Sequence, residues 1–287
     1  MPASAEELVE LLSLEEIDRN LFRGRQPDTT MQRVFGGQVA AQALIAACRT
    51  VDPKYHAHSL HSYFLRPGDT AVPIVYDVEQ LRDGRSFATR RVVARQHGRA
   101  IFFLTGSFQI DEGGFDHQDA MPETPGPDDG VALADLVRAQ GRAEGDRFAR
   151  EWAALDVRYV GISGRGLPAD PAEPARARVW VRVNGELSDD PVQQLAAFTY
   201  ASDLTLLGAT LVPHGVTIGS PGLQPASLDH AMWFHRPFRA DEWWLYDQHA
   251  PSAQGARGLA LARVFTEDGR LVSSVAQEGL IRQVDPS

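Results

Sequence analysis

The sequence lacks the features that mark secreted, zinc-binding and membrane-spanning proteins. It has one cysteine, Cys48, in 287 residues, which excludes an internal disulfide framework and a cysteine-based zinc site. No apolar run approaches the ~20 residues that a membrane-spanning helix needs. The stretch MPASAEELVELLSLEE (1–16) is acidic and lacks the basic start and apolar core of a signal peptide. We therefore expect a cytoplasmic protein with no membrane partner.

Positive charge is also scarce. The chain has 28 Lys and Arg against 38 Asp and Glu, a formal net charge of −10. Nonspecific binding to nucleic acids or anionic membranes needs basic surfaces, so we predict no nucleic-acid partner. A phosphorylated small substrate remains compatible with this charge, because a few local arginines can hold phosphates on an acidic protein.

The motifs of several common enzyme classes are missing. The chain has no G-x-G-x-x-G, no P-loop and no H-E-x-x-H motif. The stretch GISGR (161–165) fails the G-x-S-x-G pattern because Arg165 stands where glycine is required. The nine histidines show no convincing metal-ligand spacing. We predict neither a metal nor a cofactor.

What the chain does contain is an internal repeat. YFLRP (63–67) and WFHRP (233–237) share Phe-x-Arg-Pro at a separation of 170 positions. HGR (97–99) and DGR (268–270) follow at a separation of 171, with a glycine-containing turn in between in both halves. Landmarks that recur in the same order predict a duplicated unit.

Each repeat is predicted to combine one helix with several antiparallel strands. Ala-rich stretches of helical periodicity span 38–51 and 192–208. The runs 259–265 and 270–277 flank an acidic turn with glycine and predict a hairpin. In RVWVRVNGE (178–186) the valines alternate with other residues, which is typical of a half-buried strand. The pattern favours an α+β fold with a helix packed on a sheet.

The segment between the repeats differs in composition. Residues 111–129 are rich in proline and acids and predict a linker, and residues 131–158 look helical and polar. We therefore place an N-terminal repeat at 1–115, a linker with a helix at 116–165 and a C-terminal repeat at 166–287.

Two capping-box patterns lie near the N-terminus. Ser4 is followed by Glu7, and Ser13 is followed by Glu16, each at the spacing that starts a helix. One or two short helices are expected before the first repeat.

Three polar residues lie inside apolar segments of the second repeat. Asp203, in FTYASDLTLLG, either caps or ends a helix, or serves as a general base with a raised pKa. Ser227 opens the run SLDHAMWF, in which strand alternation places His230 on the other face, so no Ser-His-Asp arrangement can be assumed. Gln277 ends a strand, where an amide either satisfies the backbone or orients a reactant.

Six blocks together resemble the acyl-CoA thioesterase II family, from about residue 7 to about residue 283. The blocks are VFGGQVAAQAL (34–44), HSLHSYFLRPGD (58–69), LRDGRSFATRRV (81–92), YASDL (200–204), SLDHAMWFHRPF (227–238) and VAQEG (275–279). The resemblance implies an α+β double hotdog fold, in which two helix-on-antiparallel-sheet repeats form one continuous sheet. It also implies hydrolysis of medium- or long-chain fatty acyl-CoA to free fatty acid and CoA, and a homo-oligomer, either a dimer or a tetramer.

The same resemblance assigns the site residues. The family's catalytic Asp, hydroxyl residue and Gln correspond to Asp203, Ser227 and Gln277, which together would hold a water. Gly37 and Gln38, at the start of the first helix, are predicted to bind substrate through backbone N–H groups. His61 is a further predicted substrate-binding residue, although a satisfied polar group at a sheet margin explains it as well.

The repeat suggests one active site per chain. At the repeat offsets, Ala47, Ala57 and Gly106 of the first repeat lie opposite Asp203, Ser227 and Gln277. Two alternatives stay open at this point: a non-catalytic acyl-CoA-binding hotdog protein, and a hotdog enoyl-CoA hydratase. The hydratase would require a catalytic His in an Asn-Pro-x-His-like stretch, which the sequence does not contain.

Overall fold

The computed structural model describes residues 1–139, 145–163, 166–167 and 171–284. Arg165, on which the comparison with the G-x-S-x-G pattern turns, lies outside these residues. The described strands form one sheet, with the order β1-β2-β4-β5-β6-β3-β12-β15-β14-β13-β10-β8-β7. β11 pairs with β15, and β9 pairs with β8.

The first repeat contains two helices and six strands among the described residues. They are α1 (Ala5–Leu12), β1 (Leu14–Asp18), β2 (Leu21–Gly24), α2 (Gly36–Cys48), β3 (Tyr55–Phe64), β4 (Ile74–Asp83), β5 (Phe87–Gln96) and β6 (Arg99–Ile110).

The chain then continues through a linker into the second repeat. The linker region holds η1 (Pro127–Asp129), β7 (Val131–Ala132), α3 (Leu133–Ala139), α4 (Gly145–Glu151), β8 (Leu155–Ser163) and β9 (Gly166–Leu167). The second repeat proper holds β10 (Arg176–Val183), α5 (Pro191–Ser202), η2 (Leu206–His214), β11 (Leu223–Ser227), β12 (Asp229–Phe234), β13 (Trp244–Gln254), β14 (Arg257–Thr266) and β15 (Leu271–Gln283).

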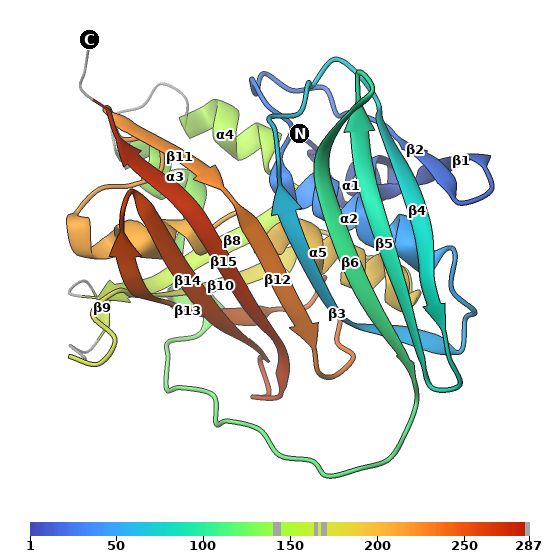
Figure 1. The fold of residues 1–287 in the computed structure, drawn as a ribbon. Helices are drawn as coiled ribbons and strands as arrows, with labels where there is room; N and C mark the ends of the chain where they lie inside the picture. The colour runs from blue at the N-terminus through green and yellow to red at the C-terminus, as the bar shows by residue number, and fades with distance from the viewer. Residues whose placement is uncertain (140–144, 164–165, 168–170, 285–287) are drawn as a thin grey trace.

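The two repeats share one sheet and one helical layer. β3 pairs antiparallel with β12, so that Ala231 lies opposite His61 at the centre of the molecule. α2 and α5 lie against each other on one face of this sheet (Figure 1). The Ala-rich sequence of α2 explains this contact, because small side chains let two helices approach closely while remaining buried. The predicted double hotdog fold is confirmed.

Several predicted elements form close to their expected bounds. Both Ala-rich helices exist, and β14 and β15 form the predicted hairpin. Ser4 caps α1 by accepting a hydrogen bond from the Glu7 amide at 3.2 Å. The helix predicted from the second capping box is wrong, because Ser13 ends α1 and the following residues form β1. β1 is held by antiparallel pairing with β2, which outweighs the local capping signal.

The predicted polar helix at 131–158 is correct only in part. Its middle forms α3 and α4, and residues 140–144 lie outside the described part of the chain. Its end is wrong, because residues 155–158 belong to β8, which pairs with β10. Valines and tyrosine follow along β8, and pairing with the edge of an existing sheet favours an extended backbone there.

The linker covers the outer face of β10. Trp180 donates from its indole nitrogen to the Pro125 carbonyl at 2.8 Å, and Arg178 donates to the Glu123 carbonyl at 2.7 Å. Trp180 is consequently only 2% exposed. β10 is therefore buried on both faces, whereas the alternation in its sequence predicts a half-buried strand.

One segment is apolar enough to resemble a membrane span. Pro191–His214, which comprises α5 and η2, has the length and composition of a spanning helix, yet 72% of its most apolar window is buried inside the molecule. This segment contradicts the expectation that no apolar run approaches the length of a membrane-spanning helix. Its burial against the sheet makes it a core element of the fold.

Candidate active site

The three polar residues singled out in the second repeat meet at one point. Gln277 donates from Nε2 to Asp203 Oδ1 at 2.5 Å and lies 3.2 Å from Ser227 Oγ. The Ser227 hydroxyl lies 3.5 Å from the same carboxylate oxygen. An acid, a hydroxyl and an amide from three different elements therefore form one hydrogen-bonded cluster.

Asp203 lies where the ends of the two central helices meet. It follows the last residue of α5, and its carboxylate faces the start of α2, where the backbone N–H of Gly37 interacts with it. A carboxylate at a helix C-terminus is unfavourable, but the positive end of a second helix favours it. The N-terminus of α2 therefore stabilises this carboxylate in its ionised form.

The close approach of the helices depends on two glycines. A Cβ on Gly36 would lie 2.6 Å from Asp203 Oδ2, and a Cβ on Gly37 would lie 2.2 Å from the Tyr200 carbonyl oxygen. Any larger residue would force the helix ends apart. The sequence GG at 36–37 thus serves packing in addition to the predicted role of its N–H groups.

A β-bulge orients Ser227 toward the site. Ser227 lies opposite Gly279 and Ala231 lies opposite Ala276, so that this stretch has one residue more than its partner strand. The extra residue, Leu228, shifts the alternation between β11 and β12. Ser227 therefore faces the helices, as buried His230 does, and the prediction that they lie on opposite faces is wrong.

Gln277 is the most deeply buried member of the cluster, at 0% exposure. Its Nε2 is used by Asp203 and Ser227, whereas its Oε1 is buried and has no hydrogen-bond partner within the described part of the chain. A buried amide oxygen without a partner costs free energy unless a ligand or water satisfies it. This oxygen can accept a hydrogen bond from a bound water.

Burial sets the protonation of Asp203. Desolvation raises its pKa to about 6, against the opposing effect of hydrogen bonds from Gln277, Gly37 and Ser227. Asp203 remains partly exposed to solvent, although protein atoms surround its carboxylate. Such a group is ionised near neutral pH yet more basic than an ordinary aspartate, which suits a general base.

The adjacent Asp229 and His230 have supporting roles. Asp229 accepts a hydrogen bond from the Glu278 amide at 2.6 Å and thereby ties β12 to β15. His230 is fully buried, lies 2.9 Å from Ser202 Oγ, and has a pKa lowered by desolvation to about 4. It is therefore neutral near pH 7 and is not placed to act on Ser227.

The predicted substrate-binding residues are only partly brought to the site. The Gly37 N–H lies at the cluster, but its partner is Asp203. The Gln38 side chain is buried and donates to the Arg25 carbonyl at 3.1 Å, which leaves its backbone N–H as the only part of the residue suited to the prediction. His61 is exposed on the opposite face of the sheet, where it packs edge-on against Trp233. The structure does not bring His61 to the site.

The equivalent place in the first repeat lacks this chemistry. Ala57 and Gly106 stand where Ser227 and Gln277 stand in the second repeat. When α2 and α5 are aligned by their first residues, Cys48 lies opposite Asp203, one position beyond the Ala47 of the sequence alignment. Burial raises the pKa of the Cys48 thiol to about 12, so it offers no base. Among the residues that the structure describes, only one such cluster is present.

Comparison with known proteins places this geometry in context. The sequence profile described as acyl-CoA thioesterase matches residues 161–280, and that of the acyl-CoA thioesterase N-terminal domain matches residues 25–109. The chain is 40% identical to acyl-CoA thioesterase 2 of Haemophilus influenzae over 283 residues, which covers 96% of each chain. It is also 40% identical to acyl-coenzyme A thioesterase 8 of Mus musculus, covering 95% of this chain and 88% of the relative. The crystal structure of an acyl-CoA thioesterase II from Mycobacterium marinum superposes with a TM-score of 0.84 at 47% identity, covering 97% of this chain and 99% of that one.

Proposed function

Because this chain belongs to the acyl-CoA thioesterase family and is a thioester hydrolase of acyl-CoA, we propose that it acts through one water held by Asp203, Ser227 and Gln277. The observation that carries the proposal is the hydrogen-bonded cluster of these three side chains beside the start of α2. The decisive experiment is the replacement of Asp203 by Asn.

We assign a role to each residue of the cluster. Asp203 takes a proton from the water while the water oxygen attacks the thioester carbonyl carbon. Ser227 and the free Oε1 of Gln277 hold the water in position, which lowers the entropic part of the barrier. Collapse of the tetrahedral intermediate breaks the carbon–sulfur bond and releases the acid and the CoA thiolate.

The departing group requires no strong acid catalyst. A thiol has a pKa of about 8.5, so its thiolate leaves readily near neutral pH. This agrees with a site in which His230, hydrogen-bonded to Ser202 beside Asp203, is buried and neutral. The oxyanion needs donors, and we assign it the Gln38 backbone N–H at the start of α2, since the Gly37 N–H is engaged by Asp203.

The rate should depend on pH through Asp203. We expect kcat/KM for an acyl-CoA to fall as the pH is lowered through about 6, because desolvation raises the pKa of Asp203 to about that value and only the carboxylate can accept a proton. The check is a pH–rate profile between pH 4.5 and 9 with a thiol reagent at saturating concentration. An unchanged rate below pH 5 would contradict the assignment of Asp203 as the base.

Ser227 distinguishes hydrolysis by water from an acyl-enzyme route. Replacement of Ser227 by Ala should lower kcat by about 10- to 100-fold, since one water-positioning hydrogen bond is lost while the base remains. Replacement by Thr, which keeps the hydroxyl, should retain most activity and serves as the control. Complete loss in the Ala variant, together with a covalent acyl adduct on Ser227 in the wild type by mass spectrometry, would overturn the water mechanism.

Chain length, assembly and location are further parts of the proposal. We propose medium- or long-chain acyl groups as substrates, cytoplasmic residence and a homo-oligomer. The outer face of the central strands supports self-association, because Tyr63 and Trp233 are 51% and 38% exposed there. Hydrolysis rates for acyl-CoA substrates of increasing chain length test the substrate class. Light scattering of the purified protein tests the homo-oligomer.

A further inference from the structure

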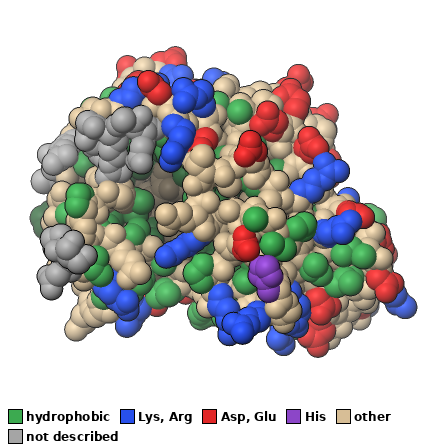
Figure 2. Space-filling view, turned by 90° about the horizontal axis from the view of Figure 1, so that it is seen from above, with side chains coloured by type: hydrophobic (Ala, Val, Ile, Leu, Met, Phe, Trp, Pro, Cys, Tyr) green, Lys and Arg blue, Asp and Glu red, His purple; other side chains and the backbone are tan. Residues whose placement is uncertain are grey.

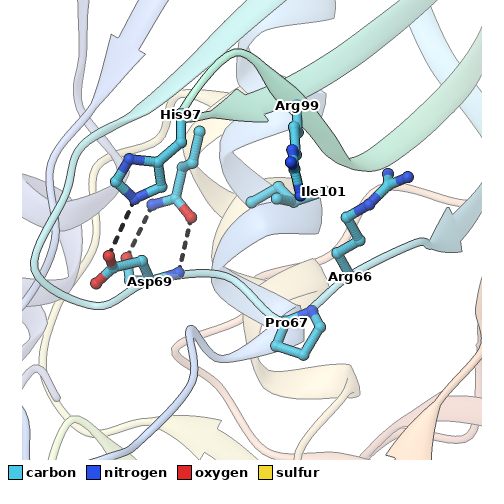
Figure 3. A pocket seen from close by; sticks show the side chains of 7 residues that line it. Arg66, Pro67, Asp69, His97, Arg99 and Ile101 are labelled. Atoms are coloured by element: carbon cyan, nitrogen blue, oxygen red, sulfur yellow. Dashed lines mark hydrogen bonds and ion pairs between the residues drawn. The ribbon is translucent and has the colours of Figure 1, made fainter.

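A cavity of about 500 Å³ opens beside the turn that ends β3. It is lined by residues of that turn and of the β5–β6 hairpin, including Arg66, Asp69, His97 and Arg99 (Figure 3). β3 and β5 both end at the upper edge of the molecule in Figure 1, so both turns lie on the face that Figure 2 views. That face carries Lys and Arg side chains, with Asp and Glu side chains between them (Figure 2).

Two guanidinium groups in this cavity have no carboxylate partner within the described part of the chain. Arg66 uses Nη1 to donate to the Ala100 carbonyl at 2.6 Å, which leaves its other arm free. Arg99 is exposed at the start of β6. An arginine without a carboxylate beside a cavity is suited to bind an anion, because its planar fork matches two oxygens of a phosphate.

The second repeat has the same corner, but its own carboxylates fill it. Arg236, the counterpart of Arg66, uses Nη1 in the same way on the Leu271 carbonyl at 2.8 Å. Its Nη2 binds the carboxylate of Asp116 and the carbonyl of His117, both from the linker. The linker therefore supplies an anion to the arm that is free in Arg66.

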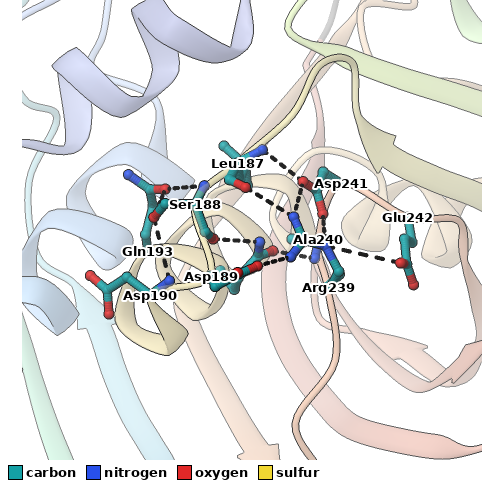
Figure 4. Close-up of polar contacts among 10 residues, drawn as sticks. Leu187, Ser188, Asp189, Asp190, Gln193, Arg239, Ala240, Asp241 and Glu242 are labelled. Carbon is teal, nitrogen blue, oxygen red and sulfur yellow. Dashed lines mark hydrogen bonds and ion pairs between the residues drawn. The ribbon is translucent and has the colours of Figure 1, made fainter.

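The other cations of the second corner are also neutralised. Arg270, the counterpart of Arg99, pairs with Asp268 at 3.2 Å. Arg239 pairs with Asp241 at 2.7 Å and with Asp189 at 2.5 Å (Figure 4). In the first repeat, His97 stands where Asp268 stands in the second, so Arg99 loses this partner.

Asp69 is the one carboxylate among the described residues that line the open cavity. Its oxygens are engaged by the Ala71 amide at 2.9 Å and by His97 Nε2 at 3.1 Å. Its backbone is fixed by buried Gln96, which accepts from the Asp69 amide at 2.8 Å and donates to the Asp69 carbonyl at 2.8 Å. The carboxylate therefore pairs with His97 and with neither arginine in the described part of the chain, and the backbone of this turn is fixed by two hydrogen bonds.

The open corner lies at the catalytic end of the molecule. The Val34 amide, two residues before α2, donates to the Gly68 carbonyl at 3.1 Å. Gly36 approaches both Phe64, at the end of β3, and the carboxylate of Asp203. The filled corner lies at the other end, where Arg239 holds the Leu187 carbonyl before the start of α5.

We propose that Arg66 and Arg99 bind a phosphate group of the CoA moiety, at the place that corresponds to the Asp116 carboxylate in the second repeat. The inference rests on the proposed function, since it assigns the phosphate-bearing end of the same substrate. The first repeat keeps its corner open for the substrate, at the end of the molecule where the catalytic cluster lies, and the second repeat closes its own corner, at the other end, with the linker.

The test compares a substrate that carries phosphates with one that lacks the whole 3′-phospho-ADP part of CoA. Lauroyl-CoA carries phosphates, and lauroyl-pantetheine carries none. For Arg99→Gln we expect the KM for lauroyl-CoA to rise about tenfold, as one exposed charge-assisted contact is lost, with kcat within twofold of the wild type. The KM for lauroyl-pantetheine should not change. Arg270→Gln, at the counterpart position, is the matched control and should leave both constants as they are.

Other outcomes overturn the proposal in recognisable ways. Equal rises in KM for both substrates would assign Arg99 a structural role, and no rise for either would remove it from the site. A changed oligomeric state of Arg99→Gln with unchanged KM would assign the corner to an acidic segment of a second copy. Failure of the wild type to hydrolyse either substrate would instead refute the proposed function, so that the two failures are distinguishable.

Discussion

Replacement of Asp203 by Asn is expected to lower kcat for acyl-CoA hydrolysis by about 10³-fold, within the 10²- to 10⁴-fold range of a general base. Asn has the size of Asp and can still accept the hydrogen bond from Gln277, but it cannot take a proton from water near neutral pH. The measurement is the steady-state rate with a medium- or long-chain acyl-CoA at pH 8. Wild-type turnover by this variant would refute the mechanism.

The same variant should be more stable than the wild type at pH 8. The pKa of Asp203 is raised in the folded protein, so its contribution to the free energy of unfolding is present at low pH and is lost as the pH rises through about 6. A pKa of about 6 instead of an ordinary aspartate value corresponds to at most about 3 kcal/mol, and the partial accessibility of the side chain reduces this. Denaturant unfolding at pH 8 and pH 4 should show the difference shrinking at the lower pH. A variant that is inactive because it is unfolded would instead have a lower free energy of unfolding than the wild type at pH 8.

Asp229 provides the matched control. It is the next aspartate after Asp203 in the sequence, and it accepts a hydrogen bond from the Glu278 amide at 2.6 Å. Replacement of Asp229 by Asn should change kcat by less than about threefold, since this carboxylate ties two strands together and does not enter the catalytic cluster. An equal loss of kcat in Asp229→Asn and Asp203→Asn would contradict this assignment and indicate Asp229, in β12, as the general base.

The repeated phrase predicts the fold better than any single element does. YFLRP and WFHRP mark the ends of β3 and β12, and these two strands pair with each other at the centre of the sheet. The sequence also predicts the cluster, because Asp203 and Gln277 are polar residues in apolar segments whose counterparts in the first repeat are apolar or small. Polar residues in a core are rare enough to be informative in a single sequence.

Other features depend on contacts between distant parts of the chain. The phase shift at Leu228 arises from pairing with β15, so strand alternation alone places Ser227 on the wrong face. The burial of Trp180 comes from a linker segment that is remote in sequence. Residues 155–158 form a strand because β10 offers them an edge. Local propensity carries no information on any of these partners.

The close contact between the helix ends is a further case, and it gives the second large effect. Replacement of Gly37 by Ala should lower kcat by about 10²-fold, since displacement by about 1 Å at a catalytic group has that cost. The new Cβ would lie 2.2 Å from the Tyr200 carbonyl oxygen, a backbone atom that cannot move without α5. The contact between the Gly37 N–H and Asp203 lowers the pKa of that carboxyl. Separation of the helix ends weakens this contact and therefore raises the pKa. We therefore expect the midpoint of the pH–rate profile to move above about 6.

Stability and a matched glycine complete the Gly37 experiment. Overpacking at this contact should lower the free energy of unfolding by about 1–3 kcal/mol, measured by denaturant unfolding. Gly208, in the adjacent η2, has no atom within 4 Å of an added Cβ, so Gly208→Ala should leave both activity and stability within error or slightly raise stability. Wild-type kcat and an unshifted pH midpoint in Gly37→Ala would contradict the dependence of Asp203 on the start of α2. A shifted midpoint in Gly37→Ala, with an unshifted one in Gly208→Ala, would identify the helix contact as the element that sets the basicity of the catalytic carboxylate.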